Sequence, residues 1–139
     1  MGFMAGNRDF LVGAAMLRSC GMAALRDPTL LSAWDQRVLL THGDALCLSD
    51  TAYQAFRAQV RSPAWRDEFL AQPLATREHL ARQMRDASEA NKRGRAPADW
   101  ADVDPAAAVA WMHAAGSHAM VHGHTHRPGS DVLAPGYTR

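Results

Sequence analysis

The densest group of residues able to do chemistry lies near the C-terminus. There the run VHGHTH, at residues 121–126, holds His122, His124 and His126 around Gly123. Neutral imidazole nitrogens bind manganese, iron and zinc, and a glycine lets the backbone turn so that nearby side chains face a common centre. The pattern indicates a site for one or two divalent cations, although closely spaced histidines also occur in solvent-exposed loops.

Two earlier segments have the same arrangement, an apolar strand followed by a glycine-containing loop with a side chain that can bind metal. Residues 2–9 read GFMAGNRD and carry Asn7, and residues 38–44 read VLLTHGD and carry His42. Ligands of open α/β sheets collect at the carboxyl ends of the strands. We therefore expect Asn7, His42, His124 and His126 to converge although they are far apart in the sequence.

The runs GNRD, THGD and GHTH, in this order, resemble the later motifs of the calcineurin-like metallophosphoesterases. Arg8, the run DTAYQAFR at residues 50–57 and the helix around residues 84–88 narrow the resemblance. They are similar to the pyrophosphohydrolases that cleave UDP-2,3-diacylglucosamine in the lipid A pathway of Gram-negative bacteria. The resemblance covers nearly the whole chain and implies metal-dependent hydrolysis to diacylglucosamine 1-phosphate and UMP.

Two motifs of that family are absent from this sequence. The family begins with one strand ending in Asp-x-His and a second ending in Gly-Asp, which supply most ligands of one metal and the carboxylate that bridges both. The resemblance therefore implies an internal piece of a longer enzyme, with Met1 inside the strand that leads to Asn7 and Arg139 ahead of the closing strands. Without the bridging carboxylate, two cations repel each other, so we expect this chain alone to hold one metal weakly and to have little activity.

The resemblance also assigns roles to the residues of the three loops. Asn7, His42 and His124 would hold one cation, and His126 would join the absent groups on a second, with manganese the expected metal. Arg8 stands where many relatives have a histidine that acts as general acid. Because a guanidinium stays protonated, Arg8 is better suited to binding phosphate oxygens than to donating a proton. Arg8 and His124 are the catalytic candidates.

Further polar residues are expected to contact the substrate, with Asn7 and Arg8, by the same resemblance. They are Asp50, Tyr53, Arg85, Ser88, Asn91 and Lys92. Each also has a structural interpretation. Asp50 is placed to cap a helix, Tyr53 can be a partly buried ring, and the others can form a solvated helix stripe.

Three residues beside the metal candidates are expected to orient them. Asp44 can accept from the free ring nitrogen of His42 or stabilise a turn, and Asp9 can orient Arg8 or cap the helix that follows. His122 can support the ligands or serve as a structural partner. The remaining histidines, His79, His113 and His118, are expected at the surface.

Apolar periodicity and turn residues predict the elements that position these loops. Helices are expected over residues 10–19 (capped by Asp9), 50–61, 63–71, 74–92 and 105–115, strands over 29–33, 37–41 and 119–121, and a basic linker over 92–97. The fold class is α/β (α+β), an incomplete metallophosphoesterase sandwich with a helical cap insertion. The partial core is expected over residues 1–48 and 98–139, and the cap over 49–97.

The expected cap combines large apolar side chains with arginines. The apolar residues are Trp65, Phe69, Leu70, Leu74, Leu80 and Met84, and the basic ones are Arg61, Arg66, Arg77, Arg82 and Arg85. An ordinary amphipathic subdomain with one buried face accounts for this pattern. A slot for acyl chains, with arginines near phosphate or an anionic membrane surface, accounts for it as well.

The composition fits one globular domain. The 139 residues are 47% hydrophobic and 21% charged, and a formal net charge of +1 gives no field that favours nucleic acid. No apolar run reaches the roughly 18 residues of a membrane span. Cys20 and Cys47 are too few for a disulfide framework, so reduced thiols in the cytoplasm are expected. The resemblance implies peripheral attachment to the cytoplasmic face of the inner membrane, and the oligomeric state is open.

Two alternative functions fit the same residues. The first is a metallophosphoesterase of another subfamily acting on a soluble nucleotide or phosphoester, in which the apolar cap residues pack together and leave no acyl slot. The second is a non-enzymatic metal-binding or interaction module, with the helical segment as a partner surface.

Overall fold

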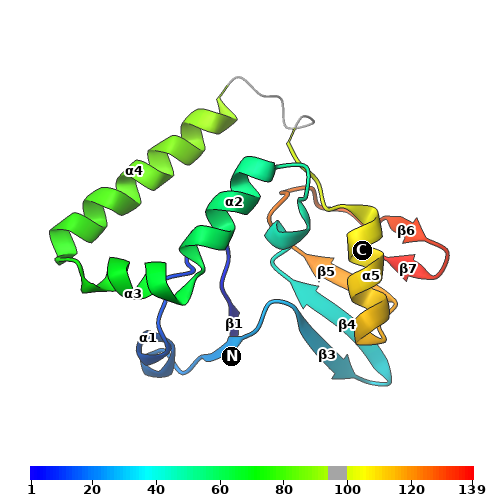
Figure 1. The fold of residues 1–139 in the computed structure, drawn as a ribbon. Coiled ribbons are helices and arrows are strands. Elements are labelled where there is room, and N and C mark those ends of the chain that lie inside the picture. The colour runs from blue at the N-terminus through cyan, green and yellow to red at the C-terminus, as the bar shows by residue number, and fades with distance from the viewer. Residues whose placement is uncertain (94–99) are drawn as a thin grey trace. The chain divides into compact units, whose positions relative to one another are not determined.

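The computed structural model describes residues 1–93 and 100–139 (Figure 1). The chain forms two compact units. The first comprises residues 1–54 and 101–139 and mixes strands with helices, and the second comprises residues 55–100 and is helical in its described part. The mixed α/β class predicted from the sequence is confirmed.

The first unit contains a five-stranded sheet in the order β3-β4-β5-β7-β6. Strands β3 (Thr29–Ala33) and β4 (Gln36–Thr41) are antiparallel and joined by Trp34 and Asp35, whose φ angles of 48° and 60° suit a two-residue hairpin turn. Strand β5 (Ala119–His122) runs parallel to β4. The predicted strands at these three places are confirmed.

Three short strands of the first unit were not predicted from the sequence, whereas the strand predicted before the Asn7 loop is present as β1. Strands β6 (Val132–Ala134) and β7 (Tyr137–Thr138) form a hairpin at the sheet edge, where no strand was predicted. Strand β1 (Gly2–Met4) pairs in parallel with an unpredicted strand, β2 (Ala23–Leu25), outside the five-stranded sheet. Each of these strands has two or three residues, too few to show an apolar alternation.

Helix α1 (Ala14–Ser19) is shorter than predicted, because the expected start at residue 10 and the cap at Asp9 are both wrong. Gly13 occupies the N-cap position without a side-chain hydrogen bond. The Asp9 carboxylate instead accepts a hydrogen bond from the backbone N–H of Gly6, upstream of it in the chain. That upstream bond closes the loop after β1 and leaves the carboxylate unavailable to the helix.

Helix α5 (Pro105–Ala115) covers one face of the sheet (Figure 1). Proline at the first position, the Asp104 carboxylate accepting from Ala107 N at 2.8 Å, and Gly116 at φ 60° fix its ends as predicted. Its inner face joins β4, β5 and the following loop in the main core. That core contains Leu39, Leu46, Cys47, Val103, Ala108, Met112 and Met120.

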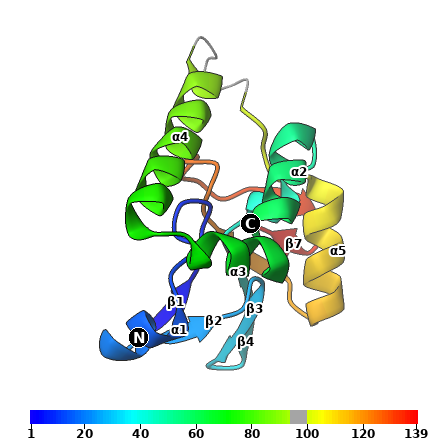
Figure 2. The same ribbon diagram turned by 60° about the vertical axis from the view of Figure 1, so that its left-hand side comes forward.

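The second unit is built from three helices. Helix α2 (Thr51–Val60) begins in the first unit, where the Gln54 side chain donates to the backbone oxygens of Asp44 and Cys47 at 2.7 and 3.1 Å. Helices α3 (Pro63–Ala71) and α4 (Leu74–Lys92) have the predicted bounds and meet at a sharp bend (Figure 2). Among the described residues, no helix is long and apolar enough to span a bilayer.

Candidate metal centre at the ends of β4 and β5

The loops that follow β4 and β5 lie at the same edge of the sheet, because the two strands are parallel. Thr41 is paired with His122, and beyond this pair the Gly123 N–H donates to the His42 carbonyl at 3.2 Å. The imidazole rings of His42 and His124 then meet edge to face, with centroids 5.1 Å apart. The structure therefore brings together two of the predicted metal ligands from residues 82 positions apart.

The loop after β1 reaches the same place. The Asn7 backbone N–H donates to Nε2 of His42 at 3.2 Å. Gly6 makes this approach possible, because a Cβ at that position would lie 3.0 Å from Cε1 of His42. The three loops singled out in the sequence thus meet at His42.

The backbone of His42 is held by a residue that the sequence analysis missed. One carboxylate oxygen of Asp27 accepts from Thr41 Oγ1 at 2.5 Å and from the His42 N–H at 3.2 Å. The other carboxylate oxygen of Asp27 is buried and has no hydrogen-bond partner among the described residues. Asp27 lies 15 residues before His42 in a turn, so no local spacing indicated this contact.

Asp44, Tyr53 and Asp50 connect the His42 loop to helix α2. Asp44 is completely buried, and its Oδ2 accepts from the Tyr53 hydroxyl at 2.7 Å. The Tyr53 ring lies against His124, with centroids 5.5 Å apart. Asp50 accepts from the Tyr53 backbone N–H at 3.0 Å, which confirms its interpretation as a helix cap. Tyr53 is therefore a half-buried link between a buried carboxylate and a candidate ligand.

The remaining histidines of the C-terminal loop are more open. His124 and His126 have φ angles of 66° and 54°, and between them Thr125 is buried. His126 is exposed, while the half-buried His122 has Nδ1 2.9 Å from the Gly123 oxygen. The role of His126 on a second metal and that of His122 stay predictions.

Five further residues were predicted to contact the substrate. Arg8 is exposed in the loop after β1. On α4, in the second unit, Arg85 is exposed and Ser88 is half-buried. The side chains of Asn91 and Lys92 lie outside the described residues, and the roles given to all five residues stay predictions.

The donor set fits a divalent cation in part. Two imidazoles that share a cation through one nitrogen each, at about 2.1 Å, have ring centroids roughly 4.5–5.5 Å apart. The 5.1 Å separation of His42 and His124 lies in that range. Across residues 1–93 and 100–139, no group of three or more His, Cys, Asp or Glu side chains is arranged to hold a metal ion. The two imidazoles thus have a separation that suits a shared cation, while Asn7 is placed here by its backbone N–H, and the metal-binding roles of all three residues stay predictions.

The electrostatic surroundings also favour a cation. Burial, followed by the charges of Asp102, Asp44 and Asp50, raises the pKa of the Cys47 thiol to about 11. Burial is the largest cause of this rise, and the three carboxylates add to it because their negative charges oppose ionisation of the thiol. Cys47 lies at the end of the loop that starts with His42, so the same carboxylates favour positive charge there.

The second unit contains an apolar groove of about 470 Å³ between its helices. Trp65 and Phe69 stack in it, with centroids 4.9 Å apart and planes 20° apart. The lining also includes Phe56, Val60, Leu80 and Met84, with Gln59, Glu68, Gln72 and Gln83. Leu70 and Leu74, two other apolar residues of the expected cap, are exposed and lie outside the groove lining.

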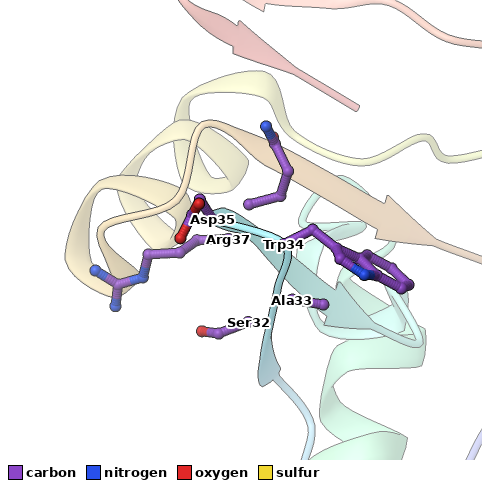
Figure 3. A pocket seen from close by; sticks show the side chains of 6 residues that line it. Ser32, Ala33, Trp34, Asp35 and Arg37 are labelled. Carbon is purple, nitrogen blue, oxygen red and sulfur yellow. The ribbon is translucent and has the colours of Figure 1, made fainter.

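A second hollow lies at the opposite end of β4 (Figure 3). It is lined by residues 32–37 of the β3–β4 turn, where Trp34 is 93% exposed. The Arg37 guanidinium is held by the Ala115 carbonyl at 2.9 Å. This hollow is the open surface of one hairpin turn, and none of the predicted site residues lines it.

Curated relatives of this chain share one name. The chain is 48% identical to a UDP-2,3-diacylglucosamine hydrolase of Xanthomonas campestris pv. campestris strain B100, over 96% of this chain and 57% of the relative. It is 50% identical to the protein of that name from Chromobacterium violaceum, over 90% of this chain and 53% of the relative. The chain belongs to their family. It spans slightly more than half the length of these UDP-2,3-diacylglucosamine hydrolases, and no family model matches it.

Proposed function

We propose that this chain is part of a metal-dependent enzyme that hydrolyses the pyrophosphate bond of UDP-2,3-diacylglucosamine to diacylglucosamine 1-phosphate and UMP. One observation carries the proposal: the Asn7 loop, His42 and His124 meet at one sheet edge. The proposal is also supported by the 48% identity to relatives named for hydrolysis of that compound.

In this proposal Asn7, His42 and His124 hold one divalent cation, His126 contributes to a second, and manganese is the metal. Bound divalent cations polarise phosphoryl oxygens and lower the pKa of bound water towards ~7. His42 and His124 contribute neutral nitrogens and Asn7 a neutral carbonyl oxygen, so they leave the cation its positive charge. Asp27 and Asp44 fix the loop that carries His42.

Arg8 binds the phosphate oxygens next to the scissile bond. An arginine side chain presents its donors in a planar fork that matches two phosphate oxygens. UMP is a good leaving group because its phosphate carries the developing charge without full protonation. The site therefore needs charge stabilisation at this position more than a proton donor.

The groove of the second unit is the proposed site for the acyl chains. Its volume of about 470 Å³ falls in the range of ligand pockets, and its walls combine aromatic rings with Val60, Leu80 and Met84. Exposed arginines on the same helices, such as Arg66, Arg82 and Arg85, suit contact with an anionic membrane surface. This supports a peripheral enzyme on the cytoplasmic face of the inner membrane.

The experiment follows UMP release with Mn²⁺ from UDP-2,3-diacylglucosamine and from UDP-N-acetylglucosamine, which has the nucleotide but no long acyl chains. It uses the chain alone and the chain joined to the flanking segments of the Xanthomonas relative. We expect the joined protein to prefer the acylated substrate, and His42→Ala or His124→Ala to reduce turnover by at least about a thousandfold, since donors to a catalytic metal are lost.

The groove is tested with Trp65→Ala and a matched control, Leu74→Ala, which removes an exposed apolar residue outside the lining. Trp65→Ala is expected to raise KM for the acylated substrate about tenfold, and Leu74→Ala to leave it unchanged. Equal turnover of both substrates, unaffected by Trp65→Ala, would favour a hydrolase of soluble nucleotides. Metal binding without turnover of either substrate would favour a non-enzymatic module.

A further inference from the structure

The loop that carries His124 and His126 has an unusual backbone. Both residues lie in the left-handed region, with φ angles of 66° and 54°, where non-glycine residues are uncommon. Such conformations persist when surrounding contacts fix them. The contacts at the two ends of this loop therefore determine whether both imidazoles stay in place.

The start of the loop is held by the sheet. The Gly123 N–H donates to the His42 carbonyl at 3.2 Å, and the Thr125 N–H donates to the Gly123 carbonyl at 2.8 Å. The Thr125 side chain is buried. These bonds fix the chain up to Thr125 but do not constrain it after His126.

The end of the loop is held by an ion pair. Arg127, the residue after His126, places Nη1 3.0 Å from Oδ2 of Asp102. Asp102 lies two residues before Asp104, which caps α5. The pair therefore ties the loop to the start of the helix that covers the sheet.

Asp102 is itself firmly positioned. Arg139 binds it with both guanidinium Nη atoms, Nη1 to Oδ1 and Nη2 to Oδ2 at 2.9 Å each, and the Val103 N–H donates to Oδ1 at 2.7 Å. Bidentate charge-assisted bonds are among the strongest and most directional in proteins. The Arg139 hydrogen bonds are the largest cause that holds the pKa of Asp102 at about 2, and this keeps it ionised at neutral pH.

We propose that Asp102, acting through Arg127, is a positioning residue that holds the His124–His126 loop in its cation-binding conformation. The inference rests on the proposed function for the cation, but the claim about the loop backbone stands separately. Asp102 touches neither imidazole in the contacts described above, so it acts on them through the backbone.

The test compares three substitutions in the 139-residue chain. Arg127→Gln removes the ion pair and leaves the Asp102–Arg139 bonds intact. Asp102→Asn weakens both the ion pair with Arg127 and the bonds to Arg139. Asp131→Asn is the matched control, because it removes a charge that contacts Arg139 at 3.1 Å and leaves the Arg127–Asp102 pair in place.

The first readout needs no metal. Hydrogen exchange of the Thr125 amide, which makes the last of these backbone bonds before the ion pair, and the ¹⁵N shifts of the His124 and His126 imidazoles are measured by NMR. We expect Arg127→Gln and Asp102→Asn to speed this exchange roughly tenfold and to shift both imidazoles, because local opening exposes the loop amides. Asp131→Asn should leave them unchanged. Unchanged exchange and shifts in Arg127→Gln would overturn the proposal.

The second readout is Mn²⁺ affinity, which should fall about 10- to 100-fold in Arg127→Gln and stay within twofold in Asp131→Asn. A wild-type chain that binds no Mn²⁺ would count against the proposed function while leaving the exchange comparison decisive for the loop. If Asp102→Asn fails to fold, Arg127→Gln alone decides, because it keeps the bonds that fix Asp102. A lower Mn²⁺ affinity in Arg127→Gln without faster amide exchange would also contradict the proposal.

Discussion

The two units of this chain solve different problems with different chemistry. In the first, the candidate metal ligands are fixed by buried polar groups, with Asp44 at 0% and Thr41 at 5% exposure. In the described part of the second, Val60 and Phe69 are the buried side chains, and an apolar groove stays open. A cation needs donors held within narrow limits, whereas an acyl chain needs apolar area of adaptable shape. Under the proposed function, this contrast suits a buried polar scaffold that holds the cation and an open apolar groove that takes the acyl chains.

The strongest way to break this comparison is to truncate one large side chain in each unit. Met112, at 0% exposure, belongs to the core that positions β4 and β5, and Met112→Ala should reduce the free energy of unfolding by about 3 kcal/mol. Trp65 is only half-buried at the groove, so Trp65→Ala should reduce it by about 1 kcal/mol. Urea unfolding followed by circular dichroism measures both. Equal losses would mean that the second unit is packed as rigidly as the first.

High pH should destabilise the first unit through Cys47, whose pKa is raised from 9.0 to about 11. The thiol ionises in the unfolded chain near its ordinary pKa but stays protonated in the folded chain until about pH 11. Its contribution to stability is therefore complete below pH 9 and is lost as the pH rises from 9 to 11, by roughly 2 kcal/mol. Unfolding measured across this range should show the loss, and Cys47→Ala should remove this thiol's contribution to it. The same slope in Cys47→Ala would assign the effect to other groups.

A smaller effect sharpens the role of Tyr53. Its hydroxyl binds the buried Asp44 and its ring lies 5.5 Å from that of His124. Tyr53→Phe should cost about 1–2 kcal/mol of stability, because a buried carboxylate loses a donor, and should shift the His124 ring resonances. Tyr137→Phe is a matched control, since Tyr137 packs in a similar way against His118, with centroids 5.2 Å apart. A shift at His118 as large as that at His124 would remove the special role given to Tyr53.

The helices with clear start and stop residues could be predicted from the sequence. Pro63 and Pro105 at first helical positions and Gly116 after the last turn set α3 and α5 within the predicted bounds. Helix α1 could not be predicted in the same way. Its expected cap, Asp9, binds Gly6 instead, and the choice between two backbone partners depends on how the loop folds.

Much of the candidate site was also readable from the sequence, because parallel strands place His42 and His124 at one edge. The residues that hold these loops in place could not be predicted from the sequence. Asp27 reaches His42 across 15 residues, and Asp102 reaches Arg127 across 25, and neither separation is a helical or strand repeat. The bond from the Tyr53 hydroxyl to Asp44 joins α2 to η1 (Asp44–Leu46) and was not indicated by the sequence, while the predicted substrate contact of Tyr53 stays a prediction.

The most direct measurement asks whether His42 and His124 share a cation. Substoichiometric Mn²⁺ is added to the ¹⁵N-labelled chain, and paramagnetic broadening is recorded for each of its seven histidine rings. We expect His42 and His124 to broaden first, His79 and His113 on exposed helix surfaces to broaden last, and His42→Ala to protect His124. Broadening that begins at His79 or His113, or that reaches His124 equally well in His42→Ala, would contradict a shared site.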